Sequence, residues 1–240
     1  MSGRRAQTLA VTLLVIAKSP IAGYAKTRLT PPLRPREAAD VAAASLLDTL
    51  DSVSRSRVTH RVVAFTGELA AAQRRTELTR ALSDFEVVPQ RGVGFGARLA
   101  NAHADAARHG LPVLQIGMDT PQVGPEVLTR SARILLGSDS GPDGRTGTDA
   151  VLGPAEDGGW WALGLSEPQA ARVLVDVAMS TPRTGALTRK ALQDCGNRVR
   201  LLPTFADVDT FDDALRVATM TGGQFAAAIA ALRRSGLALR

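Results

Sequence analysis

Carboxylates stand just beyond apolar runs in this sequence, at points where a buried strand would end. Asp119 follows the strand predicted over Pro112–Ile116, in the stretch "LQIGMDTPQV", and Pro121 prevents that strand from continuing. A carboxylate at a strand end can bind a hard divalent cation that bridges phosphate oxygens. The alternative is an N-cap for a helix starting near Pro125, but a cap normally lies closer to its helix. We therefore expect Asp119 to be a catalytic residue and a ligand of Mg²⁺ or Mn²⁺.

A later stretch, "FADVDTFDDAL", adds Asp207 and Asp209 between the last predicted strand and a helix. Thr210 and Asp213 have the spacing of an N-cap residue and its capping-box partner. That explanation leaves Asp209 without a structural task. Because Mg²⁺ is commonly held by few carboxylates together with phosphate oxygens, Asp209 is a candidate second metal ligand.

The stretch "GPAEDGGWWALGL" places acids, glycines and tryptophans together after another predicted strand. Asp157 could orient an acceptor hydroxyl or act as its base, so it is the second candidate catalytic residue. Trp160 or Trp161 could offer a stacking wall, because neighbours on a strand face opposite sides. A purely structural hairpin turn remains an alternative. The candidates on this acceptor side are Glu156, Gly158, Gly159 and Trp160.

Two loops offer sites for phosphate. In "AKSPIAGYAKTRL", Gly23 lets the backbone approach a ligand, and three cations could wrap a diphosphate, although an exposed basic turn would look the same. The spacing is not that of a Walker A loop. In "QRGVGFGARL", glycines before a helix could present backbone N–H groups to an anion, or serve only as a turn. The candidate nucleotide-binding residues are Lys18, Gly23, Lys26, Arg28, Gln90, Arg91 and Gly92.

Short aliphatic runs alternate with amphipathic ones, which predicts a three-layer α/β fold with a largely parallel sheet. In such sheets ligands bind beyond the carboxyl ends of the strands, where the candidate residues lie. The predicted strands are Leu9–Ala17, His60–Phe65, Glu86–Pro89, Pro112–Ile116, Ala150–Gly153, Trp160–Leu165 and Arg198–Leu202. The predicted helices are Pro35–Val53, Phe95–Arg108, Glu126–Leu136, Gln169–Val177, Arg183–Cys195, Phe211–Met220 and Gly223–Arg234, and Gly137–Asp149 is a predicted exposed loop.

The composition excludes several classes of protein. The chain has 240 residues, of which 45% are hydrophobic, and we expect one domain spanning residues 1–240. The net charge of +6 comes from scattered arginines without interleaved aromatics, which argues against nucleic-acid binding. A single cysteine, Cys195, rules out an internal disulfide and fits a small filler in a helix. The run Leu9–Ala17 fits a buried strand better than a signal peptide, and no segment is long enough to span a bilayer, so we expect a cytoplasmic protein.

Several stretches in this order resemble a bacterial family of GT-A-like nucleotide-diphospho-sugar transferases, long labelled a domain of unknown function. They are "AKSPIAGYAKTRL", "QRGVGFGARLANA", "IGMDTPQV", "VLGPAEDGGWWALGL", "STPRT" and "DVDTFDDA", which span nearly the whole chain. Some members are named as glycosyltransferases associated with arsenosugar biosynthesis. More distantly, the chain is similar to the molybdenum-cofactor and phospholactate guanylyltransferases.

The resemblance implies a Rossmann-like GT-A fold and a role for each matching position. It implies that Lys18, Lys26 and Arg28 belong to the nucleotide loop, that Asp119 and Asp209 occupy metal-binding positions, and that Asp157 lies in the acceptor-side turn. The chain departs from the family in its tryptophans, where the pattern is "DGGYY", and in "GVGFG", which lacks an aspartate before the last glycine. The first loop also lacks the G-G-x-S-x-R signature of the guanylyltransferases.

These observations predict a metal-dependent transferase that moves a glycosyl group from a nucleotide-diphospho-sugar to a small acceptor. The alternatives are a nucleotidyltransferase, which would release pyrophosphate, and a non-catalytic nucleotide-binding protein. The expected cofactor is Mg²⁺ or Mn²⁺, and the expected partners are the donor and the acceptor. A homodimer is compatible with the Ala-rich last helix, which could dock on a second subunit.

Overall fold

A computed structural model describes residues 7–137 and 148–236 of the chain. The strands are β1 (Leu9–Lys18), β2 (Val58–Thr66), β3 (Glu86–Pro89), β4 (Val113–Ile116), β5 (Ala150–Pro154), β6 (Trp160–Leu165) and β7 (Val199–Leu201). The α-helices are α1 (Pro35–Arg55), α2 (Arg75–Leu82), α3 (Phe95–Ala106), α4 (Pro125–Leu135), α5 (Thr184–Asp194), α6 (Phe211–Ala218) and α7 (Gln224–Arg234). Shorter 3₁₀ helices are η1 (Thr27–Leu29), η2 (Leu69–Ala71), η3 (Ala107–His109) and η4 (Pro168–Val175).

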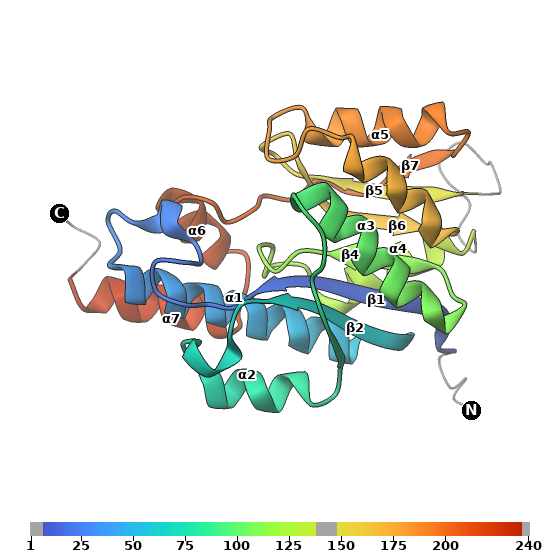
Figure 1. Cartoon of the computed structure of the whole chain (residues 1–240). Coiled ribbons are helices and arrows are strands. Elements are labelled where there is room, and N and C mark those ends of the chain that lie inside the picture. The colour runs from blue at the N-terminus through green and yellow to red at the C-terminus, as the bar shows by residue number, and fades with distance from the viewer. Residues whose placement is uncertain (1–6, 138–147, 237–240) are drawn as a thin grey trace, which may run out of the picture.

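All seven described strands form one sheet in the order β3-β2-β1-β4-β6-β5-β7 (Figure 1). Pairing is parallel between β1 and β2, β1 and β4, β2 and β3, and β5 and β7, whereas β6 is antiparallel to both of its neighbours. The carboxyl ends of the parallel strands therefore meet at one edge, as the sequence predicted. The predicted α/β fold with a largely parallel mixed sheet between layers of helices is confirmed.

Helices cover both faces of the sheet, which explains why the central strands are mostly apolar. Side chains of α1, α2 and α4 pack with one face of β1 and β4 in a first core cluster. Side chains of α3, η4 and α5 pack on the other face in a second cluster. In β4 every residue is buried, as predicted for a strand covered on both sides.

A third core cluster joins α1, α6 and α7, and Figure 1 shows α7 lying beside α1 at one end of the molecule. The carboxylate of Asp48, on α1, accepts hydrogen bonds from the backbone N–H groups of Gln224 and Phe225, each at 2.8 Å. These N–H groups belong to the first turn of α7, where no intrahelical acceptor exists. Asp48 thus caps a helix from a distant part of the chain.

Some local predictions were wrong. The sequence did not predict α2, which is short and strongly polar, and the segment near Gln169–Val177 forms the 3₁₀ helix η4. Cys195 is exposed at the C-terminal end of α5 rather than packed inside it. The predicted loop Gly137–Asp149 lies, for residues 138–147, outside the described residues. Among the described helices, none has the length and apolar character needed to cross a membrane.

Candidate functional site

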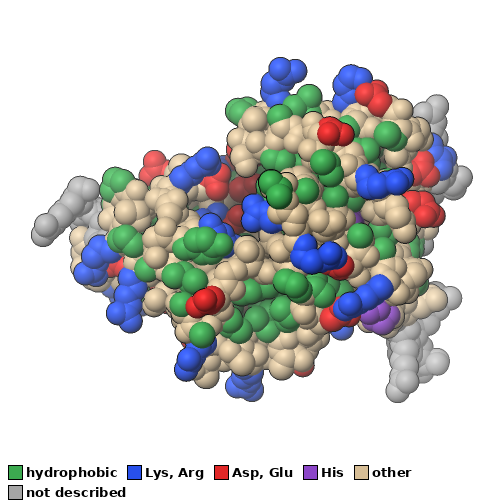
Figure 2. Space-filling view, viewed as in Figure 1, with side chains coloured by type: hydrophobic (Ala, Val, Ile, Leu, Met, Phe, Trp, Pro, Cys, Tyr) green, Lys and Arg blue, Asp and Glu red, His purple; other side chains and the backbone are tan. Residues whose placement is uncertain are grey.

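A cavity of about 880 Å³ opens at the carboxyl ends of the parallel strands. Its walls come from the ends of β1, β2 and β4, the turn before β6, the start of α3, and the segments before α5 and α6. Figure 2 shows acidic side chains recessed in a hollow of the surface, between the part that carries α6 and the part that carries α3 and α5. The cavity therefore lies where a ligand is expected in an open parallel sheet.

Asp119 projects into this cavity from the segment that follows β4. The hydroxyl of Ser45 donates to the carbonyl of Met118 at 2.6 Å, and the backbone N–H of Val208 donates to the carbonyl of Asp119 at 2.9 Å. These two bonds fix the backbone on either side of the carboxylate. The N-cap of α4 is Gly124, so Asp119 does not cap that helix.

The ammonium group of Lys26 lies among the acids of the cavity. Its Nζ is 2.7 Å from Oδ1 of Asp119 and 3.6 Å from Oδ1 of Asp209, and it also donates to the carbonyl of Val208. Burial lowers the pKa of Lys26, but the negative charges of Asp119, Asp209 and Asp207 outweigh it and the pKa is raised. Lys26 has φ 52°, a left-handed conformation that costs energy for a residue with a side chain. The backbone is thus held in an unfavourable conformation at the point where it presents this cation.

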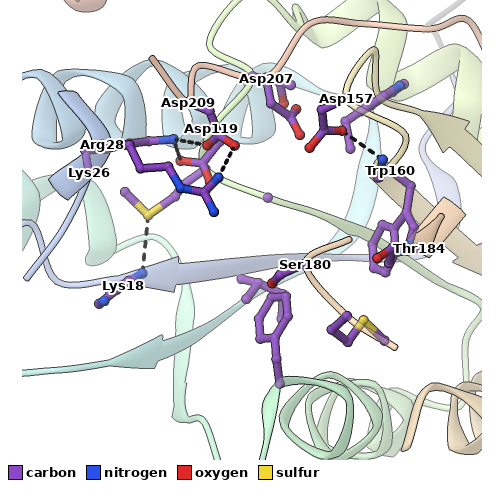
Figure 3. Close-up of a pocket in the computed structure, with 18 of the residues that line it drawn as sticks. Lys18, Lys26, Arg28, Asp119, Asp157, Trp160, Ser180, Thr184, Asp207 and Asp209 are labelled. Carbon is purple, nitrogen blue, oxygen red and sulfur yellow. Dashed lines mark hydrogen bonds and ion pairs between the residues drawn. The ribbon is translucent and has the colours of Figure 1, made fainter. Parts of the chain in front are cut away.

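Asp209 has an ion-pairing task that the sequence did not predict. Its Oδ2 accepts from Arg28 at 3.1 Å, and its Oδ1 faces Lys26 (Figure 3). The predicted capping box of α6 is confirmed, because Thr210 and Asp213 each bond to the other's backbone N–H. Asp209 stands immediately before this cap, so α6 fixes where its carboxylate points.

Asp207 is the acid that sequence reasoning passed over. Burial raises its pKa, and the charges of Asp119, Asp157 and Asp209 raise it further against the effect of Lys26, to about 7. Figure 3 shows Asp207 on the same wall as the other acids, next to Asp157. The only signal in the sequence was its position two residues before Asp209, in the connection after the last strand.

Asp157 lies in the turn between β5 and β6, and its Oδ1 accepts from the backbone N–H of Gly159 at 2.8 Å. The two glycines allow this turn to pack against the segment before α5. A Cβ atom at Gly158, which has φ 88°, would overlap the backbone of Pro182, and the N–H of Gly185 donates to the carbonyl of Gly158 at 2.8 Å. The glycines thus hold Asp157 in place through close backbone contact.

The wall beside Asp157 contains Trp160 and the segment 180–184, which is the "STPRT" stretch of the sequence. The indole Nε1 of Trp160 donates to Oγ1 of Thr188 at 3.2 Å, which fixes the ring at the edge of the cavity. Trp161 is buried and donates to the carbonyl of Pro203 at 2.9 Å. Trp161 thus lies in the core, whereas its neighbour Trp160 lines the cavity and also packs against the second core cluster.

Two cations of the cavity have no acidic partner in the part of the chain that the structure describes. Lys18 stands with its Nζ 3.7 Å from the centre of the Tyr24 ring, and its backbone N–H donates to Sδ of Met118. Arg98, on α3, lies with its guanidinium carbon 5.5 Å from the centre of the Phe95 ring. Arg98 was not predicted as a site residue, although it follows the glycine stretch by one turn of helix.

The cavity brings together most of the predicted residues. Its lining includes Lys18, Lys26, Arg28, Gln90, Asp119, Asp157, Gly159, Trp160 and Asp209. Five other candidates are not among the lining residues, namely Gly23, Arg91, Gly92, Glu156 and Gly158. Arg91 pairs with Asp105, and Glu156 pairs with Arg216 at 2.6 Å. Gln90 uses its amide nitrogen to bridge the carbonyls of Ala17 and Ala64, each at 2.9 Å.

Within the described residues, no group of three or more His, Cys, Asp or Glu side chains is arranged to hold a metal ion alone. The acids of the cavity nevertheless repel one another, as the raised pKa of Asp207 indicates. Mg²⁺ and Mn²⁺ accept oxygen ligands and are often bound by one or two carboxylates together with substrate phosphates. The donor set fits a metal that a ligand helps to bind.

Three solved structures share the fold over nearly their whole length. A protein of Desulfovibrio desulfuricans G20, provisionally named a nucleotide-diphospho-sugar transferase, is 23% identical, with 96% of this chain and 97% of that chain covered and a TM-score of 0.78. A 4-diphosphocytidyl-2C-methyl-D-erythritol synthase is 17% identical, with coverage of 90% and 99% and a TM-score of 0.54. Rv0371c of Mycobacterium tuberculosis H37Rv is 22% identical, with coverage of 88% and 98% and a TM-score of 0.53. At these identities the likeness establishes the fold.

The sequence itself matches no curated protein. It does match the model of a family described as an uncharacterized protein conserved in bacteria (DUF2064), over residues 49–181. The matched segment runs from α1 to the edge of the cavity before α5, and it includes Asp119 and Asp157. The match covers more than half of the chain, so the chain belongs to this bacterial family. The resemblance seen in the sequence predicted this membership.

Proposed function

We propose that this protein is a metal-dependent transferase that takes a glycosyl group from a nucleotide-diphospho-sugar and passes it to a small acceptor. The observation that carries the proposal is the wall of aspartates in the cavity. Asp119, Asp157, Asp207 and Asp209 come from three separate connections of the sheet, yet their charges act on one another. A structural role does not account for acids gathered at a cavity where they repel.

Asp119 and Asp209 are the residues that would hold the metal, and Asp207 is a third oxygen donor on the same wall. When bound, Mg²⁺ or Mn²⁺ would offset the negative charge that develops on the leaving diphosphate. In the structure, Lys26 neutralises part of the charge of these acids, since its Nζ lies within 4 Å of both Asp119 and Asp209. A ligand that brings a metal would free Lys26 to contact a phosphate oxygen.

Lys18 and Arg98 have no acidic partner among the described residues, so they are available to bind phosphate without breaking a described ion pair. Lys18 acts as a point charge, whereas the guanidinium of Arg98 can donate two parallel hydrogen bonds to phosphate oxygens. Both stand beside aromatic rings, which limit the orientations of the two side chains. They are the natural first contacts for the diphosphate of a donor.

Asp157 and Trp160 are suited to the acceptor. The carboxylate of Asp157 keeps Oδ2 available while Oδ1 accepts from Gly159, so it can orient an acceptor hydroxyl or accept its proton. The ring of Trp160 is held by Thr188 and offers a flat apolar face. The fold of the Desulfovibrio protein, named for nucleotide-diphospho-sugar transfer, supports this proposal in preference to a role outside nucleotide chemistry.

The test is thermal unfolding in the presence of nucleoside triphosphates and nucleotide sugars, each with and without Mn²⁺. A ligand that binds only the folded state raises Tm, so a nucleotide sugar that raises Tm more with Mn²⁺ is the expected result. Absence of any shift with all of these ligands would contradict the proposal. The best donor is then incubated with candidate acceptors: release of a nucleoside diphosphate supports glycosyl transfer, and release of pyrophosphate from a triphosphate indicates nucleotidyl transfer.

A further inference from the structure

A buried polar cluster lies beneath α3, behind the floor of the cavity. His103 of α3 and Thr12 of β1 are fully buried, and Gln115 of β4 is 2% exposed. Both ring nitrogens of His103, Oε1 of Gln115 and Oγ1 of Thr12 lack a hydrogen-bond partner within the described residues. Most buried polar atoms in proteins have a partner, so a group of unpartnered atoms calls for an explanation.

Gln115 connects this cluster to the cavity, because it is one of the residues that line the cavity. Its partners in the sheet are Leu14 on β1 and Leu163 on β6, and both are buried in the core cluster on the α3 side. A carboxamide is therefore set into an apolar floor. A buried amide group without a full set of hydrogen-bond partners is destabilising, so a ligand that hydrogen-bonds to it at the floor would be favoured.

His103 lies close enough to Gln115 for the two side chains to interact. Burial lowers the pKa of His103 to about 4 although Gln115 raises it, so the ring is neutral at physiological pH. A neutral imidazole carries one N–H donor, which suits the carbonyl oxygen of a carboxamide. A bond from His103 to Oε1 would turn the amide nitrogen of Gln115 away from α3.

We infer that Gln115 determines specificity at the floor of the cavity, where its carboxamide binds an uncharged ring of the donor through a carbonyl or hydroxyl oxygen, and that His103 orients it. This inference rests on the proposed function, since the ring belongs to the donor. A charged group would lose hydration there without a countercharge among its apolar neighbours. Phe95, which lines the same cavity and is 41% exposed, offers a face on which a ring can stack.

Such a ring could be the nucleobase or the sugar of the donor, and two ligand series separate these sources. The first series is nucleoside diphosphates that differ only in the base, and the second is nucleotide sugars that differ only in the sugar. Dissociation constants are measured for the wild-type protein first. If no member of either series binds, the proposed function fails and the inference fails with it.

If the wild type binds, Gln115→Met removes the carboxamide and keeps an unbranched side chain of similar length. We expect affinity for the preferred ligand to fall about tenfold, and the preference within one series to shrink by the same factor. Loss of preference in the first series assigns the base, and loss in the second assigns the sugar. An unchanged preference in both series would overturn the inference while leaving the proposed function intact.

Thr12→Val is the matched control, because Thr12 belongs to the buried cluster but does not line the cavity. It should leave the ligand preference unchanged, and equal loss in this variant would mean that packing, not recognition, sets the preference. Gln115→Leu repeats the test if the methionine variant does not fold. For His103, we expect His103→Leu to reduce the preference partly and His103→Gln, which keeps an N–H donor, to restore it. If the ligand preference of these variants falls only in proportion to their loss of Tm, His103 has a purely structural role.

Discussion

Asp48 and Asp207 are both half-buried aspartates, and burial raises the pKa of each, but their surroundings differ. The backbone N–H groups of Gln224 and Phe225 donate to Asp48 and offset part of this rise in its pKa. No backbone N–H of the described residues donates to Asp207, which instead faces other carboxylates. Folding supplies hydrogen-bond partners to one acid, whereas the other lines the open cavity beside like charges.

The same contrast holds for the two regions in which these acids lie. On the α1–α7 side, the carboxylate of Asp48 satisfies the first turn of a helix and closes a third core cluster. In the cavity, Lys26 compensates more than one acid, yet burial and the neighbouring carboxylates still raise the pKa of Asp207 to about 7. Unsatisfied charge, more than the mere presence of acids, marks the candidate site.

Asp119→Asn should have the largest effect, because it removes a full negative charge from the proposed metal position while keeping the shape of the side chain. We expect metal-dependent nucleotide affinity to be lost and turnover to fall about 100-fold or more. Calorimetric titration of a nucleotide with and without Mn²⁺ measures the first effect. Asp105→Asn, which alters an acid paired with Arg91 outside the cavity lining, is the control and should titrate like the wild type.

The sequence predicted the sheet and most of its carboxyl-end residues because each element has its own local signal. Buried strands such as Val113–Ile116 are mostly apolar, and the capping box of Thr210 and Asp213 lies within four consecutive residues. The short polar helix α2 lacks an apolar stripe long enough to be seen. Its existence depends on packing against α1, which only the folded chain provides.

The sequence was enough to choose several acids of the candidate site, but it did not show which cations pair with them. Asp119, Asp157 and Asp209 could be chosen because they follow strands, but their partners lie far away in sequence. The ion pair of Lys26 with Asp119 joins the segments that follow the neighbouring strands β1 and β4, which are far apart in sequence. Arg98 reaches the cavity only because α3 begins at its rim. Ligand-binding cations therefore cannot be told from paired ones before the fold is known.

Arg98→Gln tests whether an unpaired cation is the one that binds phosphate. We expect the affinity for nucleoside diphosphates in the absence of metal to fall about tenfold, with a shallower dependence on salt concentration. The affinity for the corresponding nucleoside should not change, because it carries no phosphate. Arg91→Gln is the matched control, since Arg91 is exposed and already paired with Asp105. Equal losses in the two variants would mean that Arg98 contributes only through the overall charge.

Asp48→Ala examines the satisfied carboxylate of the comparison. Its removal leaves the N–H groups of Gln224 and Phe225 without an acceptor, so we expect a loss of about 1 kcal/mol in the free energy of unfolding. Chemical denaturation measures this loss, and nucleotide affinity should stay constant. Asp51→Ala, on the same helix, removes only the exposed ion pair with Arg55 and should cost less. A nucleotide-binding defect in Asp48→Ala would show that the two regions are coupled.

Asp207→Asn should have the smallest effect and the opposite sign. The folded-state pKa of about 7 lies above the ordinary value of 3.8, so the stability that Asp207 contributes when protonated is lost as pH rises between these values. Without metal, the variant should therefore melt a degree or two higher than the wild type at about pH 8, and no higher at about pH 4. With Mn²⁺ and nucleotide at the higher pH, the wild type should instead melt higher than the variant, because a nearby cation then stabilises the ionised carboxylate. If the Tm of the variant does not rise at high pH, or stays above that of the wild type with metal bound, Asp207 is a structural acid like Asp48.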